Sequence, residues 1–205
     1  MGEEDAAHHA IAKRVDPATL QTLETFVGLC KSWGAKTNLV SSADKERLWS
    51  RHVADSLQLV GAAHGLGGHW IDLGAGAGFP GLVVAIARPE TTMTLVESNK
   101  KKAAFLLRVA AECKVALRVE SRRAEALPPK AFDVVSARAL APLHKLLALS
   151  EPFFGDTTVG LFPKGREAAT ELTMAHQSYR FDVDITPSRT DPDGVILRVR
   201  NLVRA

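Results

Sequence analysis

The sequence predicts an α/β fold, in which a mostly parallel sheet of seven strands carries helices on both faces and includes an antiparallel strand near its end. Three observations support this prediction. Short apolar runs alternate with helix-like segments from residue 69 to residue 177. The first run leads into a glycine-rich loop, as in a strand followed by a helix. Two more apolar runs close the chain, and the turn-rich link between them indicates a hairpin.

The first part of the 205-residue chain is predicted to be a helical extension that precedes the sheet. Residues 1 to about 15 look like a loose terminus. Asp16 and Pro17 then suit the N-cap and first position of a helix, which Gly34 is expected to end. A second helix is predicted from about Asp44 to Ala62, and a glycine-rich linker follows it up to residue 68. We therefore place the extension at residues 1–66.

Residues 67–205 are predicted to form one compact sheet domain. The predicted strands are His69–Leu73, Met93–Glu97, Ala116–Val119, Phe132–Ser136, Val159–Phe162, Phe181–Thr186 and Val195–Leu202. The predicted helices between them are Pro80–Ala87, Asn99–Cys113, Pro142–Leu149 and Arg166–Gln177. In open sheets of this kind, ligands bind at the carboxyl ends of the strands, so we expect the functional residues there.

Composition excludes few functions. The hydrophobic content of 46% and charged content of 24% are ordinary for a soluble domain. No apolar run is long enough to span a bilayer, and the acidic, polar start is unlike a secretory signal, so we expect a cytoplasmic protein. The net charge of +3 permits an anionic partner without requiring one. The histidines show no metal-ligand spacing, and Cys30 and Cys113 are predicted to be reduced core thiols.

The glycine loop is the most informative stretch, WIDLGAGAGFPG at residues 70–81. Gly76, Gly78 and Gly81 satisfy the G-x-G-x-x-G pattern of nucleotide-binding loops. By itself this pattern suits a dinucleotide, which would lay its pyrophosphate on the amides at the helix start, or S-adenosylmethionine. A simple strand-to-helix turn is the structural alternative.

Asp72 helps to choose between these cofactors. It lies two residues before Gly74, where its carboxylate would repel a pyrophosphate and suits a sulfonium cation or an ammonium group. The resulting acid-x-G-x-G-x-G pattern is the form found in methyltransferases. The sequence therefore favours S-adenosylmethionine as the cofactor and a Rossmann-like, class I methyltransferase fold.

Acids after the next two strands extend the predicted cofactor site. Glu97 closes the second strand and could accept hydrogen bonds from both ribose hydroxyls. The third strand ends near Glu120, and we assign Glu125 and the amide of Ala124 to the adenine edge. For both Glu97 and Glu125, a solvated acid near a helix start is the alternative interpretation.

Several separate segments resemble one family, the bacterial ribosomal RNA small subunit methyltransferase G family, also called glucose-inhibited division protein B. The matching segments are Trp33 with Asn38-Leu39-Val40, Arg51–Ser56, Asp72–Gly81, Glu97-Ser98, Lys101-Lys102, Phe105-Leu106, Arg123–Glu125, Ser136–Ala139 and Lys164-Gly165. The most specific parts are G-F-P-G at residues 78–81 and R-H-x-x-D-S at residues 51–56. The last forty residues match only loosely.

The resemblance implies an enzyme that moves the methyl group of S-adenosylmethionine to N7 of guanine 527 in 16S ribosomal RNA. It implies cofactor contacts at Gly74, Phe79, Ala124, Glu125 and Arg138. The family often has Asp at position 97 and Leu at position 79, and both differences keep the chemistry. The expected partner is 16S ribosomal RNA, free or within the small subunit. We expect a monomer with no metal and no membrane partner.

Cationic residues follow several strands. Arg138 comes after the fourth strand, where it could pair with the methionine carboxylate of the cofactor or with an RNA phosphate. Lys164 follows the fifth strand on the same rim, and Arg123 and Arg166 could extend this rim toward RNA phosphates. A solvated charge is the alternative for each. The run of three lysines from Lys100 to Lys102 could serve an anionic partner or form an exposed, salt-screened face, and we favour the exposed face.

The segment from Arg51 to Ser56 has two interpretations. An exposed ion pair between Arg51 and Asp55, four residues apart on a helix, would explain both charges. The resemblance instead implies that this helix roofs the pocket, with His52 or Asp55 touching the base. We therefore name Arg138, Lys164, His52 and Asp55 as candidates for substrate positioning, and assign no certain catalytic residue.

The chemistry of the implied acceptor agrees with the residues after the fourth strand. Guanine N7 carries a lone pair and no proton, so catalysis should depend mainly on placement. The N/D-P-P-Y/F loop of enzymes that methylate exocyclic nitrogens is replaced here by Ser-Ala-Arg-Ala at residues 136–139. Three alternatives stay open: a methyltransferase for a small molecule or protein, an NAD-dependent oxidoreductase, and a cofactor-binding module without catalysis.

Overall fold

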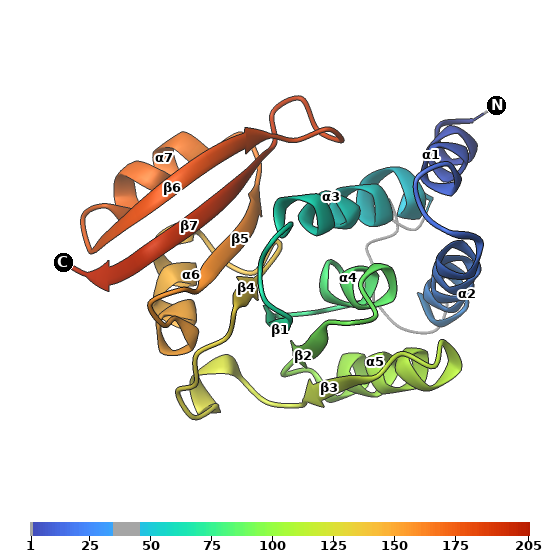
Figure 1. The fold of residues 1–205 in the computed structure, drawn as a ribbon, viewed down its shortest axis with the longest axis horizontal. Helices are drawn as coiled ribbons and strands as arrows, with labels where there is room; N and C mark the ends of the chain where they lie inside the picture. The colour runs from blue at the N-terminus through green and yellow to red at the C-terminus, as the bar shows by residue number, and fades with distance from the viewer. Residues whose placement is uncertain (1, 35–45) are drawn as a thin grey trace.

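The computed structural model describes residues 2–34 and 46–205 and confirms the predicted sheet (Figure 1). The strands are β1 His69–Leu73, β2 Thr92–Val96, β3 Leu117–Glu120, β4 Val134–Ser136, β5 Val159–Lys164, β6 Tyr179–Pro187 and β7 Val195–Arg204. They form one sheet in the order β3-β2-β1-β4-β5-β7-β6. All pairs from β3 to β5 are parallel, whereas β7 is antiparallel to both β5 and β6, as the C-terminal hairpin predicts.

Helices cover both faces of the sheet. Their bounds are α1 Glu3–Ala12, α2 Pro17–Gly34, α3 Ala54–Ala62, α4 Gly81–Ala87, α5 Lys100–Glu112, α6 Leu143–Ser150 and α7 Ala168–Ala175. Figure 1 shows α6 and α7 on one side of the sheet and α2, α4 and α5 on the other. Successive side chains of β1 point to opposite faces of the sheet, and each face is covered by its own helices. Trp70 packs into the cluster that contains α2, α4 and α5, whereas Ile71 and Leu73 pack against α6.

The strand register brings the carboxyl ends of the central strands to one edge. Leu73 at the end of β1 pairs with Val96, and Val96 at the end of β2 pairs with Glu120. Asp72 pairs with Ser136 at the end of β4. The glycine loop and the segments after β2, β3 and β4 therefore begin at the same edge of the sheet, where a ligand site is expected.

The prediction of a loose N-terminus is wrong, because Glu3–Ala12 forms helix α1. The Glu4 carboxylate accepts hydrogen bonds from the backbone N–H groups of Trp49 at 2.9 Å and Ser50 at 2.7 Å. Burial raises the pKa of Glu4, but hydrogen bonds from Ser50 and Trp49 outweigh it and lower the pKa. Ile11 is buried in the main core. The acids in the first turn of α1 and its alanines are local helix signals, whereas the contacts that dock the helix come from residues distant in sequence.

The second predicted helix is only partly described. Its expected start at Asp44, and the Asn38-Leu39-Val40 segment of the family resemblance, lie outside the described residues. From Leu48 to Val53 the chain forms a π-helical segment, η1, and α3 follows directly at Ala54. Such wide helical turns are rare and occur often at functional sites.

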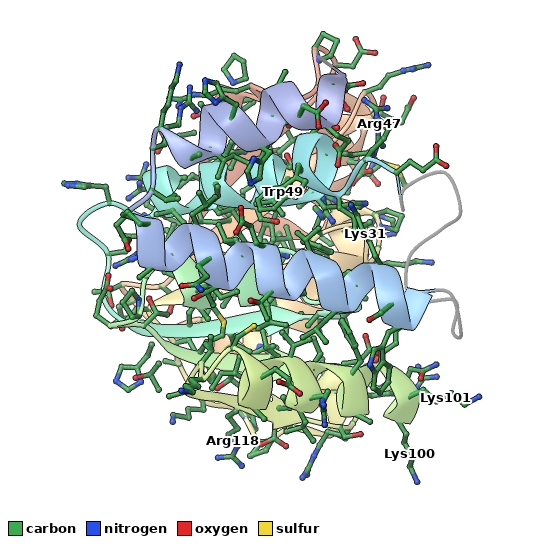
Figure 2. The ribbon with its side chains drawn as sticks, turned by 90° about the vertical axis from the view of Figure 1, so that its right-hand side faces the viewer. Lys31, Arg47, Trp49, Lys100, Lys101 and Arg118 are labelled. Atoms are coloured by element: carbon green, nitrogen blue, oxygen red, sulfur yellow. The ribbon has the colours of Figure 1, made fainter. Side chains whose placement is uncertain are left out.

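The N-terminal helices share a hydrophobic core with the sheet. Phe26 of α2 packs on Phe79 of the glycine loop, with ring centroids 5.0 Å apart, and both belong to the cluster that contains Trp70. Figure 2 shows α1, α2 and α5 stacked along this side of the molecule. The division into residues 1–66 and 67–205 stays a prediction. None of the helices within the described ranges 2–34 and 46–205 has the length and apolar character needed to cross a membrane.

Candidate functional site

A cavity of about 850 Å³ opens at the carboxyl edge of the sheet. Its walls come from the glycine loop, from η1 and α3, from the loop after β4, and from the end of β5 with the β6–β7 loop. Its lining includes Gly74, Gly76, Phe79, His52, Asp55, Arg138, Lys164, Thr190 and Asp191. In the part of the chain that the structure describes, we find no group of three or more His, Cys, Asp or Glu side chains arranged to hold a metal ion.

The glycine loop presents bare backbone to this cavity. Gly76 has φ +57, in the left-handed region, and its N–H donates to the Glu97 carboxylate at 2.9 Å. A Cβ added at Gly76 would meet no protein atom closer than 3.8 Å, so this position faces open space. At Gly81 the glycine is needed for packing instead, since a Cβ there would lie 2.4 Å from a Leu95 methyl carbon. The glycine loop therefore lets a ligand approach closely at Gly76 and lets β2 pack closely at Gly81.

Asp72 does not line the cavity, contrary to the expectation that it faces the cofactor's cation. Its side chain is fully buried and accepts hydrogen bonds from the Gly81 N–H at 3.0 Å and the Ser136 hydroxyl at 2.6 Å. Ser136 in turn accepts from the Trp70 indole N–H at 2.8 Å. Because Asp72 and Trp70 are two residues apart on β1, they point to the same face, under α4. Asp72 fixes the start of α4 against β1 and β4.

Burial raises the pKa of Asp72 to about 7, although hydrogen bonds from Ser136 and Gly81 and the charge of Arg138 lower it. The folded protein therefore binds this proton more tightly than the unfolded chain does. The contribution of Asp72 to the free energy of unfolding should fall as the pH rises from about 4 to about 7 and should not change further at higher pH.

The Asp72→Asn variant removes this titration, so we expect its free energy of unfolding, relative to the wild type, to rise by a few kcal/mol over that pH range. Urea unfolding of both proteins at several pH values between 4 and 8 measures the difference, and titrations common to both proteins cancel. Parallel stability curves would contradict the assignment.

Glu97 supports the loop from the end of β2. It is buried, and its two carboxylate oxygens accept from the Gly76 N–H at 2.9 Å and the Asn99 N–H at 2.7 Å. Asn99 caps α5 through its own side chain. Glu97 therefore joins the glycine loop to the next helix, and its predicted contact with a ribose stays a prediction.

The predicted adenine contacts lie on the next strand end. Ala124 and Glu125 belong to a single turn of 3₁₀ helix, η2 Ala124–Ala126, that follows β3. Glu125 is exposed and Ala124 half-buried, and neither lines the cavity. Glu120 is the more buried acid here and pairs with Arg122 at 3.1 Å. The register places η2 at the same edge as Glu97, and the roles of Ala124 and Glu125 stay predictions.

Arg138 joins the loop after β4 to the roof formed by η1 and α3. Its guanidinium donates to the Asp55 carboxylate at 3.1 Å and to the Arg51 carbonyl at 3.3 Å. A second guanidinium nitrogen lies 2.5 Å from His52 Nδ1. Since arginine has no acceptor, Nδ1 accepts this bond and the proton of a neutral His52 lies on Nε2. The alternative interpretation of Asp55 as the exposed partner of Arg51 is wrong, because Asp55 is half-buried and pairs with Arg138.

Aromatic stacking completes this corner of the cavity. The His52 ring stacks on Phe79, with centroids 4.9 Å apart and planes 29° from parallel. The Arg138 guanidinium lies 5.5 Å from the centroid of the same Phe79 ring. The structure thus brings together Phe79, His52, Asp55 and Arg138, which we predicted separately from distant parts of the sequence.

The predicted basic rim is less uniform than expected. Lys164 lines the cavity, but its ammonium group is largely buried, donates to the Ala141 carbonyl and pairs with Glu171, both at 2.8 Å. Arg166 is 80% exposed and lies 3.6 Å from Asp193, outside the cavity lining. Arg123 is exposed at the start of η2. Lys164 therefore orders the loop after β4, while Arg123 and Arg166 present charge to solvent.

The model of the GidB family, described as rRNA small subunit methyltransferase G, matches residues 19–190. The chain belongs to this family. The ribosomal RNA small subunit methyltransferase G of Methylobacterium nodulans is 42% identical over 208 residues, which cover 98% of each chain. That of Methylorubrum populi is 46% identical over 195 residues, covering 93% of this chain and 92% of its own. Membership shows an enzyme family that methylates the RNA of the small ribosomal subunit.

Solved structures support the fold class. The N-methyltransferase NodS from Bradyrhizobium japonicum, in complex with S-adenosyl-L-homocysteine, superposes with a TM-score of 0.57 at 12% sequence identity. The match covers 83% of this chain and 98% of NodS. The protein therefore has the Rossmann-like fold of class I methyltransferases.

Some cavity residues were missed by the sequence analysis. Lys102 belongs to the lysine run that we interpreted as an exposed face, yet it is half-buried and lines the cavity. Arg47 also lines it and pairs with Glu3 of α1 at 2.7 Å. The β6–β7 loop contributes Thr190 and Asp191, although its turn-rich sequence predicts only a hairpin. A helical period places Lys102 on the same side as buried Phe105, which is the one signal that could have been used.

Proposed function

We propose that this protein transfers the methyl group of S-adenosylmethionine to N7 of guanine 527 in 16S ribosomal RNA, as a cytoplasmic monomer. Membership of an rRNA small subunit methyltransferase family supports the RNA substrate. The observation that carries the proposal is the cavity itself. Its lining combines bare glycine-loop backbone with the side chains of Phe79, His52 and Arg138, which contact one another.

The cofactor side of the cavity is the glycine loop. The residues that would hold S-adenosylmethionine are Gly74, Gly76, Gly78 and Phe79, with Glu97 at the end of β2 and Ala124 and Glu125 after β3. Arg138 lines the same cavity, and its expected contact with the cofactor stays a prediction. When bound, this cofactor supplies a methyl group attached to a positively charged sulfur. The open space beside the Cα of Gly76 fits such a ligand, because no side chain of the protein fills it.

The acceptor side must position a base. Because guanine N7 has no proton to lose, the residues here need not include a general base, and an in-line approach to the methyl group is the main requirement. The His52 ring stacked on Phe79 provides a flat surface, and Arg138 provides a planar donor beside it. Asp55 pairs with Arg138 and limits the positive charge near a ring that becomes cationic.

Phosphate contacts would come from cations around the cavity. The charged residues that line it are Arg47, Arg51, Lys102, Arg138, Lys164, Asp55, Glu171 and Asp191. Figure 2 shows Arg47, Lys100 and Lys101 toward the same end of the helical layer. We propose that these residues, with Arg123 and Arg166, attract the RNA backbone, so that binding weakens as salt rises.

The test uses S-adenosylmethionine with a labelled methyl group. Small ribosomal subunits that lack the modification and naked 16S RNA are incubated in parallel with the purified protein, and the labelled base is then mapped. We expect label on N7 of guanine 527, and the better substrate of the two identifies the form that is used. Label on a protein, on a small molecule or on another base would contradict the proposal.

A further inference from the structure

The β6–β7 loop forms one wall of the cavity, which the glycine loop also lines. Ser188, Thr190 and Asp191 contribute to the lining, and the loop closes on itself through a 2.8 Å hydrogen bond from the Ser188 N–H to the Gly194 carbonyl. Figure 1 shows this loop reaching from the far end of the sheet toward α3. The wall therefore comes from the C-terminal hairpin of the sheet.

Gln58 of α3 fastens this loop. Its side-chain amide nitrogen donates to Ser188 Oγ at 3.2 Å and Thr190 Oγ1 at 3.0 Å, and its amide oxygen accepts from the Arg189 N–H at 2.7 Å. Gln58 does not line the cavity. It can therefore act on a bound ligand only through the loop or through the side chains beside it.

The same network reaches the Arg138 corner through Asp55. One Asp55 carboxylate oxygen accepts from Thr190 Oγ1 at 3.1 Å and lies 3.2 Å from the Gln58 amide nitrogen. The other oxygen accepts from Arg138 at 3.1 Å. A chain of hydrogen bonds thus runs from Gln58 and the loop through Asp55 to Arg138, whose guanidinium lies 5.5 Å from the Phe79 ring.

The attachment of the hairpin to α3 has a second anchor. Arg198 of β7 donates to the Ala62 carbonyl at the end of α3, at 3.0 Å. β7 is also paired with β5 along five residue pairs, from Gly160 to Lys164. Because these contacts hold the strands without Gln58, loss of Gln58 should leave the strands in place and affect only the loop and Asp55, which the Gln58 side chain also contacts.

We propose that Gln58 is a positioning residue that holds the β6–β7 loop as the acceptor-side wall of the cavity and aligns Asp55 and Arg138 toward the RNA base. This inference rests on the proposed function. It assigns the loop to RNA rather than to the cofactor, because the hydrogen bonds that hold the loop lead to Asp55 and Arg138, which we place on the acceptor side.

The test compares Gln58→Leu with the matched control Gln21→Leu, which changes an exposed glutamine of α2. We expect Gln58→Leu to raise the KM for the RNA substrate about tenfold, because three polar links to the loop are lost. The Kd for S-adenosylmethionine, measured by calorimetry, should stay within about twofold of the wild type. Gln21→Leu should change neither value.

A second variant tests the route through the loop. Thr190→Val keeps the side-chain volume and removes the hydroxyl that joins the loop to Asp55. Because both residues act in one chain, the double variant Gln58→Leu/Thr190→Val should raise KM no more than the more severe single variant. Amide hydrogen exchange at residues 188–194 should be about tenfold faster in Gln58→Leu than in the wild type.

Several results would overturn the inference. An unchanged KM for RNA, an equal loss of S-adenosylmethionine affinity, additive effects in the double variant, or unchanged amide exchange would each contradict the positioning role. If the wild type transfers no methyl group to ribosomal RNA, the proposed function fails and this inference fails with it. A wild type that is active, with Gln58→Leu indistinguishable from it, overturns the inference alone.

Discussion

The Gly76→Val substitution is expected to weaken S-adenosylmethionine binding about 100-fold or more, because it places a branched side chain in space that the ligand needs. Gly76 lines the cavity at φ +57, and the direction of its missing Cβ is open in the protein. Calorimetric titration of the purified variant with the cofactor measures this loss directly.

Gly65 provides the matched control for this experiment. Its φ is +76 and a Cβ there would also meet nothing within 4 Å, but it lies between α3 and β1, away from the cavity lining. Gly65→Val and Gly76→Val each place a branched residue in the left-handed backbone region, which costs about 1–2 kcal/mol. Both variants should therefore have a lower melting temperature than the wild type. Only Gly76→Val should lose cofactor affinity. An equal loss in both variants would show that backbone strain, and not the site, is responsible.

The Arg138→Met substitution is expected to lower kcat/KM for RNA methylation about 100-fold, through misplacement of the acceptor base. Methionine keeps much of the side-chain length but removes the donors that join Asp55, His52 and the Arg51 carbonyl. Arg138→Lys should recover only part of the activity, because an ammonium group cannot reproduce the planar fork that reaches two side chains at once. Initial rates with labelled cofactor measure both variants.

Arg198→Met is the control for the Arg138 series. Arg198 is also half-buried and also donates to a backbone carbonyl of a helical segment, but it does not line the cavity. We expect it to affect thermal stability more than catalysis. If Arg198→Met reduces kcat/KM as strongly as Arg138→Met does, the effect of Arg138 is structural and its place at the acceptor side is wrong.

The sheet could be predicted from the sequence because its signals are local. The β1 segment HWIDL has the predicted bounds, and the glycine loop and its helix follow as expected. The C-terminal hairpin was predicted from two apolar runs and a turn, and it gives the antiparallel strand. Parallel register then places the strand ends together without any further information.

The site could be predicted only in part, because its contacts join distant segments. Asp55 was predicted as a candidate, yet its partner Arg138 is 83 residues away, and the closer Arg51 offered a simpler pairing. Asp72 was placed correctly on its strand, but the side of the sheet to which it points decides whether it meets a ligand or α4. The role of Gln58 depends on a loop about 130 residues away, so no periodicity or motif indicates it.

The proposed mechanism requires a methyl donor to bind where β1 meets α4, against the glycine loop, in the cavity that Arg138 also lines. A crystal structure of the protein with S-adenosylhomocysteine, collected alongside one of the Gly76→Val variant soaked under the same conditions, would locate that donor site. We expect ligand density against the backbone of Gly74 and Gly76 in the wild type and none in the variant. Density at another position in the wild type, or unchanged density in the variant, would contradict this placement.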